Sequence, residues 1–202
     1  MVRPPQILRY IYPGVVWNFP TKEKILYFTF DDGPIPEVTP LVLDLLKKYN
    51  AKATFFCIGD NVRKHPEIYQ RILHEGHSTG NHSYSHFNSW KVSSKVYMKD
   101  VEAAQPYISS TLFRPPYGKL TPITLFKLRR KFRIIMWDVI SGDFDEKVPA
   151  QQVEKNVLEN AVNGSVIVFH DSLKAAPRML HVLPKVLDYF SAKGFSFHSI
   201  VE

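Results

Sequence analysis

The sequence contains only one cysteine, which excludes a disulfide bond within the chain. Cys57 lies in the apolar run 53–58, where we predict a small core residue rather than a nucleophile. Apolar runs long enough to span a membrane are missing. Residues 7–19 carry Arg9 and Pro13 and lack a small-residue cleavage site, so they do not have the pattern of a signal peptide. The sequence does not determine the cellular compartment. We expect the cytoplasm unless a leader has been trimmed from the sequence.

Repeats, low-complexity runs and linkers are also missing, so nothing indicates a second domain. The 202 residues, 45% of them apolar, have the size of one domain with a substantial core. We expect this domain at 24–202, with 1–23 as an N-terminal extension that packs on it. The formal charge of +7 favours an anionic partner only weakly. The densest basic run, 127–133, has the apolar spacing of a helix, so we expect no nucleic-acid partner.

Strand-like and helix-like segments alternate along the chain about seven times. Strands are expected at 25–30, 53–58, 77–81, 112–114, 134–137, 165–169 and 195–200, with a loop at 138–147. Helices are expected to begin near Thr39, Pro66, Ser93 or Ser94, Thr121, Pro149 and Arg178. Short connections of this kind force parallel pairing with right-handed crossovers. Because the chain is shorter than an eightfold barrel of about 250 residues, we predict an α/β fold, a distorted (β/α) barrel with about seven parallel strands. A doubly wound open sheet is the alternative.

The first expected strand runs into two adjacent carboxylates, Asp31 and Asp32, and then into Gly33-Pro34. Residues 25–30 are rich in aromatic and β-branched side chains, which is typical of a strand buried on both faces. Neighbouring side chains at a strand end point to different sides, so one acid can hold a cation while the other accepts a proton. Asp-Gly-Pro alone is ordinary turn chemistry, so the rest of the chain must decide between these interpretations.

Other polar residues also follow the ends of expected strands. This set comprises Asp31, Asp32, His82, His86, Arg114, Asp138, Asp143 and His170. The carboxyl ends of parallel strands meet at one face of a barrel, which is where barrel enzymes act. Histidines with only structural roles would be scattered over the fold, so their position at strand ends indicates a site.

His82 and His86 are four residues apart, so a helical turn would bring both imidazoles within reach of one ion. Two solvated histidines are the alternative. With Asp32 they make a ligand set that leaves room for water on Zn²⁺ or a similar ion such as Co²⁺ or Ni²⁺. Such an ion lowers the pKa of bound water to about 7 and polarises a carbonyl, which indicates a hydrolase.

A hydrolase of this kind also needs a base and an acid. Asp31 can accept a proton from water, and His170 can protonate the departing group. Arg114 would keep Asp31 ionised and aimed. A packed structural histidine and a surface arginine are the alternatives for His170 and Arg114.

These segments, in this order, resemble the motifs of the polysaccharide deacetylases, metal-dependent carbohydrate esterases that share the NodB homology domain. Thr-Phe-Asp-Asp-Gly at 29–33 resembles the first motif, His-Ser-Tyr-Ser-His at 82–86 the second, Arg-Pro-Pro-Tyr-Gly at 114–118 the third and Val-Phe-His at 168–170 the fifth. The resemblance covers about residues 24–200. It implies the reduced barrel, Asp31 as base, a zinc ion on Asp32, His82 and His86, Arg114 as orienter of the base, and His170 as acid.

The resemblance also implies that the backbone N–H of Tyr117 helps to bind the oxyanion and that Asp143 tunes Arg114 or His170. The fourth motif departs from the family, because Ile-Ser-Gly-Asp-Phe at 140–144 stands where Asp-Ser-x-Asp-Trp is common. Val168 also replaces a leucine. Since Ile140, Phe144 and Val168 belong to the substrate pocket, the departures put the substrate in doubt more than the chemistry.

Three functions follow from these residues. The first is removal of acetyl groups from N-acetylated sugars in chitin-like or peptidoglycan-like glycans, an acetylated carbohydrate being the expected partner. The second is an O-acetyl esterase, since the same metal and base would attack an ester. The third is a carbohydrate-binding pseudoenzyme, suggested by the altered fourth motif. The sequence leaves the oligomeric state open.

Overall fold

The computed structural model describes residues 2–201, and its centre is a sheet of parallel strands. The strands are β1 (Ile25–Asp31), β2 (Ala53–Cys57), β3 (Ser78–Asn81), β4 (Leu112–Phe113), β5 (Arg133–Ile134), β6 (Val139–Ile140), β7 (Val166–His170) and β8 (Ser196–Phe197). Seven of them follow the order β5-β4-β3-β2-β1-β7-β6, and β8 pairs with the start of β1. All of these pairings are parallel, as the alternating pattern predicts.

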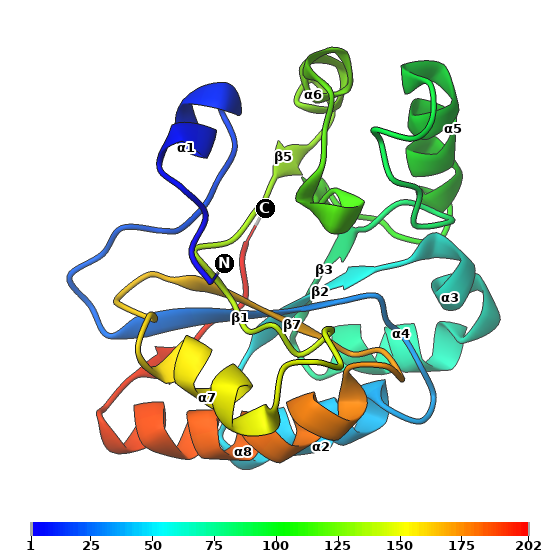
Figure 1. The fold of residues 1–202 in the computed structure, drawn as a ribbon. Helices are drawn as coiled ribbons and strands as arrows, with labels where there is room; N and C mark the ends of the chain where they lie inside the picture. Colours follow the sequence, from blue (N-terminus) through cyan, green and yellow to red (C-terminus); the bar gives the residue numbers. More distant parts are fainter. Residues whose placement is uncertain (1, 202) are drawn as a thin grey trace.

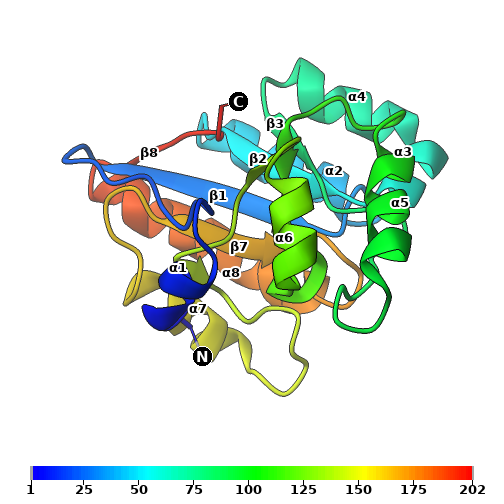
Figure 2. The same ribbon diagram turned by 90° about the horizontal axis from the view of Figure 1, so that it is seen from above.

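Helices surround this sheet. They are α1 (Ile7–Ile11), α2 (Thr39–Lys48), α3 (Gly59–Lys64), α4 (Pro66–His74), α5 (Ser94–Ala104), α6 (Pro122–Leu128), α7 (Ala150–Leu158) and α8 (Ala176–Ala192), with a short 3₁₀ turn at Pro116–Gly118. Figures 1 and 2 both show α7 beside α8, and α5 beside α6 on another side of the sheet. Within residues 2–201, none of the helices combines the length and apolar character that crossing a membrane requires.

The sheet is strongly curled, because one short segment pairs beside β5 at one end of the sheet and beside β7, the last strand but one at the other end. In a flat sheet β5 and β7 would lie roughly 24 Å apart, since neighbouring strands are about 4.8 Å apart. Val16 pairs with Ile135 just after β5, and Asn18 pairs with Ser165 just before β7. Two residues of extended chain span only about 7 Å. The predicted distorted barrel is therefore confirmed, and the open sheet is excluded.

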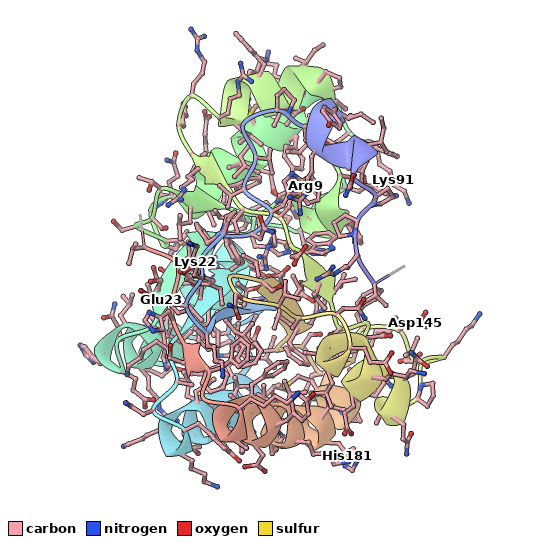
Figure 3. All side chains as sticks on the ribbon, turned by 90° about the vertical axis from the view of Figure 1, so that its left-hand side faces the viewer. Arg9, Lys22, Glu23, Lys91, Asp145 and His181 are labelled. Carbon is pink, nitrogen blue, oxygen red and sulfur yellow. The ribbon has the colours of Figure 1, made fainter. Side chains whose placement is uncertain are left out.

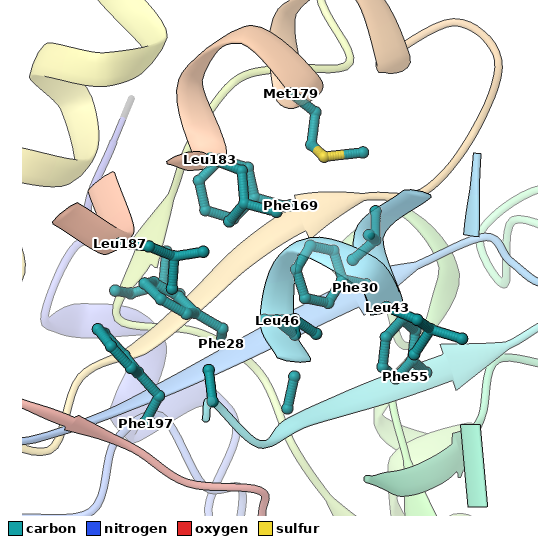
Figure 4. Close-up of a cluster of buried hydrophobic side chains, with 14 of the residues drawn as sticks. Phe28, Phe30, Leu43, Leu46, Phe55, Phe169, Met179, Leu183, Leu187 and Phe197 are labelled. Carbon is teal, nitrogen blue, oxygen red and sulfur yellow. The ribbon is translucent and has the colours of Figure 1, made fainter. Parts of the chain in front are cut away.

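β1 has an apolar face toward the helices and a polar face toward the barrel interior. Phe28 and Phe30 are fully buried and pack with aromatic residues of β2 and β7 and with leucines of α2 and α8 (Figure 4). The ring of Phe30 stacks on Phe55 of β2 at a centroid distance of 5.1 Å. The alternate side chains, Thr29 and Asp31, point the other way and contact Arg114. The central strand thus anchors the core and presents a carboxylate at its end.

Local capping explains why several helices begin where the sequence predicts. The Ser93 side chain accepts a hydrogen bond from Val96 N at 3.3 Å and caps α5. Thr121 caps α6 in the same way, with Thr124 N at 3.2 Å. Such caps satisfy amide groups that the first helical turn leaves without partners, so they mark a helix start in the sequence alone.

Three local predictions are wrong. The expected strand 134–137 is shorter and is followed by β6, which falls within the expected loop at 138–147 because it pairs with the edge of β7. Gly59, expected only to end a strand, begins α3. A Cβ on this glycine would lie 2.8 Å from side-chain atoms of Ala104 and Tyr84, so close packing requires glycine here. Helix α1 was also not expected.

The segment before β1 contributes to the core as well as to the closure of the barrel. Trp17 is only 5% exposed and packs in a cluster with residues of α5, α6 and β4. We expect Trp17→Ala to lower the free energy of unfolding by about 3–5 kcal/mol, measured by urea denaturation. Tyr10→Ala, at a side chain 82% exposed, should change it by no more than about 0.5 kcal/mol. Equal effects of the two changes would contradict the structural role of this segment.

Candidate active site

Side chains from the carboxyl ends of the strands meet around one open cleft of about 580 Å³. The cleft is lined by nine predicted residues, Asp31, Asp32, His82, His86, Tyr117, Ile140, Phe144, Val168 and His170, together with Pro115, Gly118, Lys119, Trp137, Ser172 and Lys174. The other two predicted residues, Arg114 and Asp143, lie behind the wall and are fully buried. The structure therefore brings these eleven predicted residues together.

Asp138 does not join this group, which corrects the expectation for that strand end. β6 begins at Val139, so Asp138 precedes a strand instead of following one. Its Oδ2 accepts a hydrogen bond from Ser165 Oγ at 2.7 Å. Its carboxylate also lies 3.6 Å from Arg3 and 3.5 Å from Arg9. Asp138 therefore ties the N-terminal segment to the barrel, away from the cleft.

Asp32, His82 and His86 form a possible metal site. One ligand atom from each residue can be chosen so that all lie within 4.8 Å of one another. The Oδ1 of Asp32 is 3.3 Å from His86 Nε2 and 3.8 Å from His82 Nε2. This oxygen is buried, yet no described residue donates a hydrogen bond to it. A buried carboxylate oxygen without a donor is costly, and a cation between the three side chains would satisfy it.

The tautomer of His82 also fits a cation. Its Nδ1 lies 2.7 Å from the carbonyl oxygen of Arg114, which can only accept, so the proton is on Nδ1 and donates there. Burial lowers the pKa of His82 to about 4, so the ring is neutral at pH 7. The lone pair of Nε2 consequently faces Asp32, and a backbone bond at the other nitrogen orients the ring as for a metal ligand.

The two histidines converge through a loop rather than the helical turn that their spacing suggests. Ser83 and His86 both have left-handed backbone angles, with φ of 63° and 58°. Ser83 N donates to Asn81 Oδ1 at 2.7 Å, and His86 N donates to Ser83 Oγ at 3.0 Å. These bonds hold a conformation that an L-residue adopts only at a cost of roughly 1–2 kcal/mol.

The same strain recurs around the cleft. Asp32 has φ of 86° and Tyr117 has φ of 61°, so four of the five non-glycine residues with positive φ among the described residues belong to this site. Strained backbone of this kind persists only where surrounding contacts hold it, and such residues concentrate at functional sites.

Arg114 is fully buried and joins three parts of the barrel. Its Nη1 donates to Asp31 Oδ1 at 2.7 Å and to Thr29 Oγ1 at 2.6 Å. Its Nε and Nη2 donate to the carbonyl oxygens of Ile135 and Met136 at 3.2 and 2.8 Å. Burial alone would raise the pKa of Asp31, but the charge and hydrogen bond of Arg114, together with the imidazoles of His82 and His170, hold the pKa below its usual value. Asp31 is therefore an ionised carboxylate at the floor of the cleft.

On the neighbouring strand β7, His170 lies in register with Asp31 and is held by Asp143. The His170 Nδ1–H donates to Asp143 Oδ1 at 2.8 Å, and the backbone N–H of His170 donates to Asp143 Oδ2, also at 2.8 Å. Burial alone would lower the pKa of His170, but the charge and hydrogen bond of Asp143, together with the charges of Asp32 and Asp31, outweigh it and raise the pKa to about 9. The imidazole is thus protonated at neutral pH.

Aromatic and aliphatic side chains cover the rest of the cleft. The Tyr117 ring lies 4.7 Å from the His86 ring, and the Phe144 ring meets His170 edge-on at 5.1 Å. Ile140 and Val168 are neighbours in register across β6 and β7. The positions that depart from the fourth motif therefore lie on the side of the cleft next to His170.

Known proteins share this sequence and fold. Residues 18–131 match the polysaccharide deacetylase family. A peptidoglycan-N-acetylglucosamine deacetylase of Bacillus cereus is 32% identical over 93% of this chain and 92% of its own length. The chain belongs to the polysaccharide deacetylase family. The predicted family, and with it the class of metal-dependent deacetylases, is confirmed.

Solved structures of other polysaccharide deacetylases agree with this fold. A peptidoglycan N-acetylglucosamine deacetylase in complex with 4-naphthalen-1-yl-N-oxidanyl-benzamide superposes with a TM-score of 0.85 at 33% identity, covering 98% of this chain and 95% of that one. The peptidoglycan deacetylase PdaC from Bacillus subtilis superposes with a TM-score of 0.80 at 31% identity, covering 89% of each chain.

Two residues of this polysaccharide deacetylase, Asp171 and Arg178, contribute to the site but were not among the predicted residues. Asp171 is fully buried, accepts a hydrogen bond from Gly33 N at 3.0 Å and pairs with Thr39 Oγ1 at 2.6 Å, which fixes the loop that carries Asp32. Arg178 Nε donates to Asp143 O at 2.7 Å. Asp171 directly follows the fifth motif, so its position could have suggested a role. Arg178 lies on α8, and only the fold reveals its contact.

We expect Asp32→Asn to weaken divalent-ion binding by at least about 100-fold, because an amide oxygen lacks the charge that the ion needs. Isothermal titration with Zn²⁺ measures this. Asp60→Asn is the matched control, since Asp60 pairs with Lys64 on α3 and lies outside the cleft. Undiminished affinity in Asp32→Asn would show that the ion binds elsewhere.

Proposed function

We propose that this protein removes the acetyl group from N-acetylated amino sugars of a peptidoglycan-like or chitin-like glycan. The observation that carries the proposal is the donor-free Oδ1 of Asp32, which faces two imidazoles in the same cleft as an ionised Asp31 and a protonated His170. The names of the relatives in Bacillus cereus and Bacillus subtilis support this substrate class.

The ligand set favours a borderline divalent ion. Two imidazole nitrogens and one carboxylate suit Zn²⁺, with Co²⁺ and Ni²⁺ as alternatives, whereas Mg²⁺ and Ca²⁺ prefer more oxygen ligands. Bound there, the ion would supply a Lewis acid for the acetyl carbonyl and for water.

Asp31 is proposed as the base. Its carboxylate lines the cleft floor beside Asp32, and Arg114 keeps it ionised and fixed in direction. An ionised carboxylate that is held in place can take a proton from water as the water attacks the acetyl carbon. The backbone N–H of Tyr117, in the strained turn above His86, is proposed to stabilise the negative charge on the carbonyl oxygen.

His170 is proposed as the acid. An amine leaves an amide carbon only when it is protonated, and Asp143, with the charges of Asp32 and Asp31, keeps His170 protonated at neutral pH. This favours an amide substrate over an acetyl ester, because an alkoxide leaving group depends less on protonation than an amine does. The complete set of Asp31, Arg114 and His170 also disfavours a pseudoenzyme, because buried charges without a function are costly to retain.

Acetate release from N-acetylglucosamine oligomers tests the proposal. The protein with Zn²⁺ added should release acetate, chelation should stop it, and re-added Zn²⁺ should restore it. The Asp31→Asn/Asp32→Asn double variant is the control for contaminating activity. Absence of acetate from every oligomer, with the ion bound, would overturn the proposed function.

We expect His170→Ala to slow amide hydrolysis by about 10²-fold or more, and hydrolysis of an activated aryl acetate far less, because only the amine requires protonation. The two rates are compared on the same preparation. His181→Ala is the matched control, since His181 lies on α8 (Figure 3) and is not among the residues that line the cleft. An equal loss on both substrates would assign His170 to binding.

The pH profile gives a second test of the acid. Because the pKa of His170 is raised to about 9, the acid form is present below that pH and is lost above it. Amide hydrolysis should fall as pH rises through about 9, and His170→Ala should remove this fall. If the rate of the variant still fell as pH rises through about 9, the fall would belong to a group other than His170.

A further inference from the structure

An apolar hollow of about 410 Å³ lies beside the cleft. It is lined by Ile11, Tyr12, Trp90, Leu120, Thr121, Pro122 and Leu125, and we call it the Trp90 hollow. None of these side chains is charged, and Trp90 is 60% exposed. An indole that is open to solvent within an apolar concavity is a typical contact for a ring-shaped neutral ligand.

The Trp90 hollow and the cleft meet at Lys119. The Lys119 side chain lines the cleft, and its Nζ lies 4.9 Å from the centroid of the Trp90 ring. Lys119 and Leu120 are consecutive, so one loop borders both cavities. A ligand that extends from the cleft along Lys119 would therefore come next to the Trp90 ring.

Trp90 is also connected to the possible metal site through its own loop. It follows His86 by four residues, and Trp90 N donates to Asn88 Oδ1 at 3.0 Å. Thr121 N donates to Ser89 Oγ at 3.2 Å, which fastens this loop to the loop of Lys119. The position of the indole relative to the His86 imidazole is thus set by two loops that hold each other.

The N-terminal segment completes the hollow. Tyr12 Oη donates to the carbonyl oxygen of Leu120 at 3.2 Å, and Ile11 from the end of α1 forms another wall. A segment outside the recognised motifs therefore shapes the surface next to the cleft.

We propose that the Trp90 hollow binds a sugar ring of the glycan chain, at least one unit away from the sugar that loses its acetyl group. This inference rests on the proposed function. The apolar face of a sugar ring can cover the exposed indole, and its hydroxyl groups can accept from Lys119 and the indole N–H. The uncharged lining suits a sugar better than the charged groups of a peptide or phosphate.

The dependence of the rate on chain length tests the proposal. Acetate release by the Zn²⁺-loaded protein is measured as kcat/KM for the disaccharide and the hexasaccharide of N-acetylglucosamine. Wild type should prefer the hexasaccharide, and Trp90→Ala should lower the ratio of the two constants by about tenfold. Trp90→Tyr should keep most of the preference. Phe126→Ala, at an exposed α6 aromatic that lines neither cavity, should leave the ratio unchanged.

An unchanged ratio in Trp90→Ala, or a wild type without length preference, would overturn the inference. Absence of acetate from all oligomers would overturn the proposed function, and binding then tests the hollow separately. Calorimetric titration of the hexasaccharide into the Zn²⁺-loaded Asp31→Asn protein, with and without Trp90→Ala, is the measurement. Weaker binding with Trp90→Ala supports the hollow as a sugar site, and equal binding contradicts it.

Discussion

Asp31→Asn should retain the divalent ion and lose turnover on N-acetylated oligomers by about 10²-fold or more. The asparagine keeps the shape of the side chain, and its Oδ1 can still accept from Arg114 Nη1, which lies 2.7 Å from the carboxylate. Only the ability to take a proton is lost. Because Asp32 and the two histidines are unaltered, the affinity for Zn²⁺ should change little.

The measurement pairs acetate release with calorimetric titration of Zn²⁺ on the same preparation. Asp32→Asn is the informative comparison, since it should lose the ion and the activity together. The separation of the two acids would be wrong if Asp31→Asn lost the ion as completely as Asp32→Asn. It would also be wrong if Asp31→Asn retained full turnover.

Arg114→Met should be the most destabilising change in the site, at about 3–5 kcal/mol by urea denaturation. Methionine approximates the stem of the arginine but leaves the buried Asp31 carboxylate without its partner. The carbonyl oxygens of Ile135 and Met136 also lose their donors. Without the opposing charge, burial should raise the pKa of Asp31, so the base should be lost as pH falls from a higher value than in wild type.

A double-mutant cycle measures the interaction between Asp31 and Arg114. If the carboxylate and guanidinium act together, Asp31→Asn should cost less activity in the Arg114→Met background than in wild type. Arg133→Met is a suitable control, because Arg133 is exposed, its Nη1 donates to the carbonyl oxygen of Val201, and it does not line the cleft. Additive effects of the two site changes would show that Arg114 supports the fold without acting on Asp31.

The sequence predicts the polar residues of this site well, because each is part of a short motif next to a strand end. Asp31 ends β1 and Asp32 follows it, His82 follows β3, and His170 ends β7. Parallel pairing then brings these ends to one face whatever the lengths of the connecting helices. The apolar runs that mark the strands therefore also locate the site.

Features that depend on contacts between distant segments could not be predicted in this way. The loop from His82 to His86 takes its shape from bonds to Asn81 and Ser83, although its spacing suggests a helix. β6 exists because Ile140 can pair with Val168, some 28 residues away. The sequence around Val16 has no periodic pattern that would predict its role in closing the barrel, because an isolated bridge involves only one residue of each segment.

Some residues that form the wall of the cleft also could not be predicted from the sequence. Trp137 and Lys119 line the cleft, but neither belongs to a charged or ligating pattern that would mark it in the sequence. Gly118 illustrates the close packing, since a Cβ there would lie 2.3 Å from the Trp137 ring. The shape of the pocket is therefore a property of the packed loops, whereas its ionisable residues are visible in the sequence.

The location of the bound ion tests the account most directly. Crystals of the protein grown with Zn²⁺ would be measured at the zinc absorption edge, and the anomalous difference map would be calculated without the ion. We expect one strong peak at about 2.0–2.2 Å from Asp32 Oδ1, His82 Nε2 and His86 Nε2, next to the Asp31 carboxylate. A strong peak on other residues, or no peak in the cleft at saturating Zn²⁺, would contradict the proposed centre.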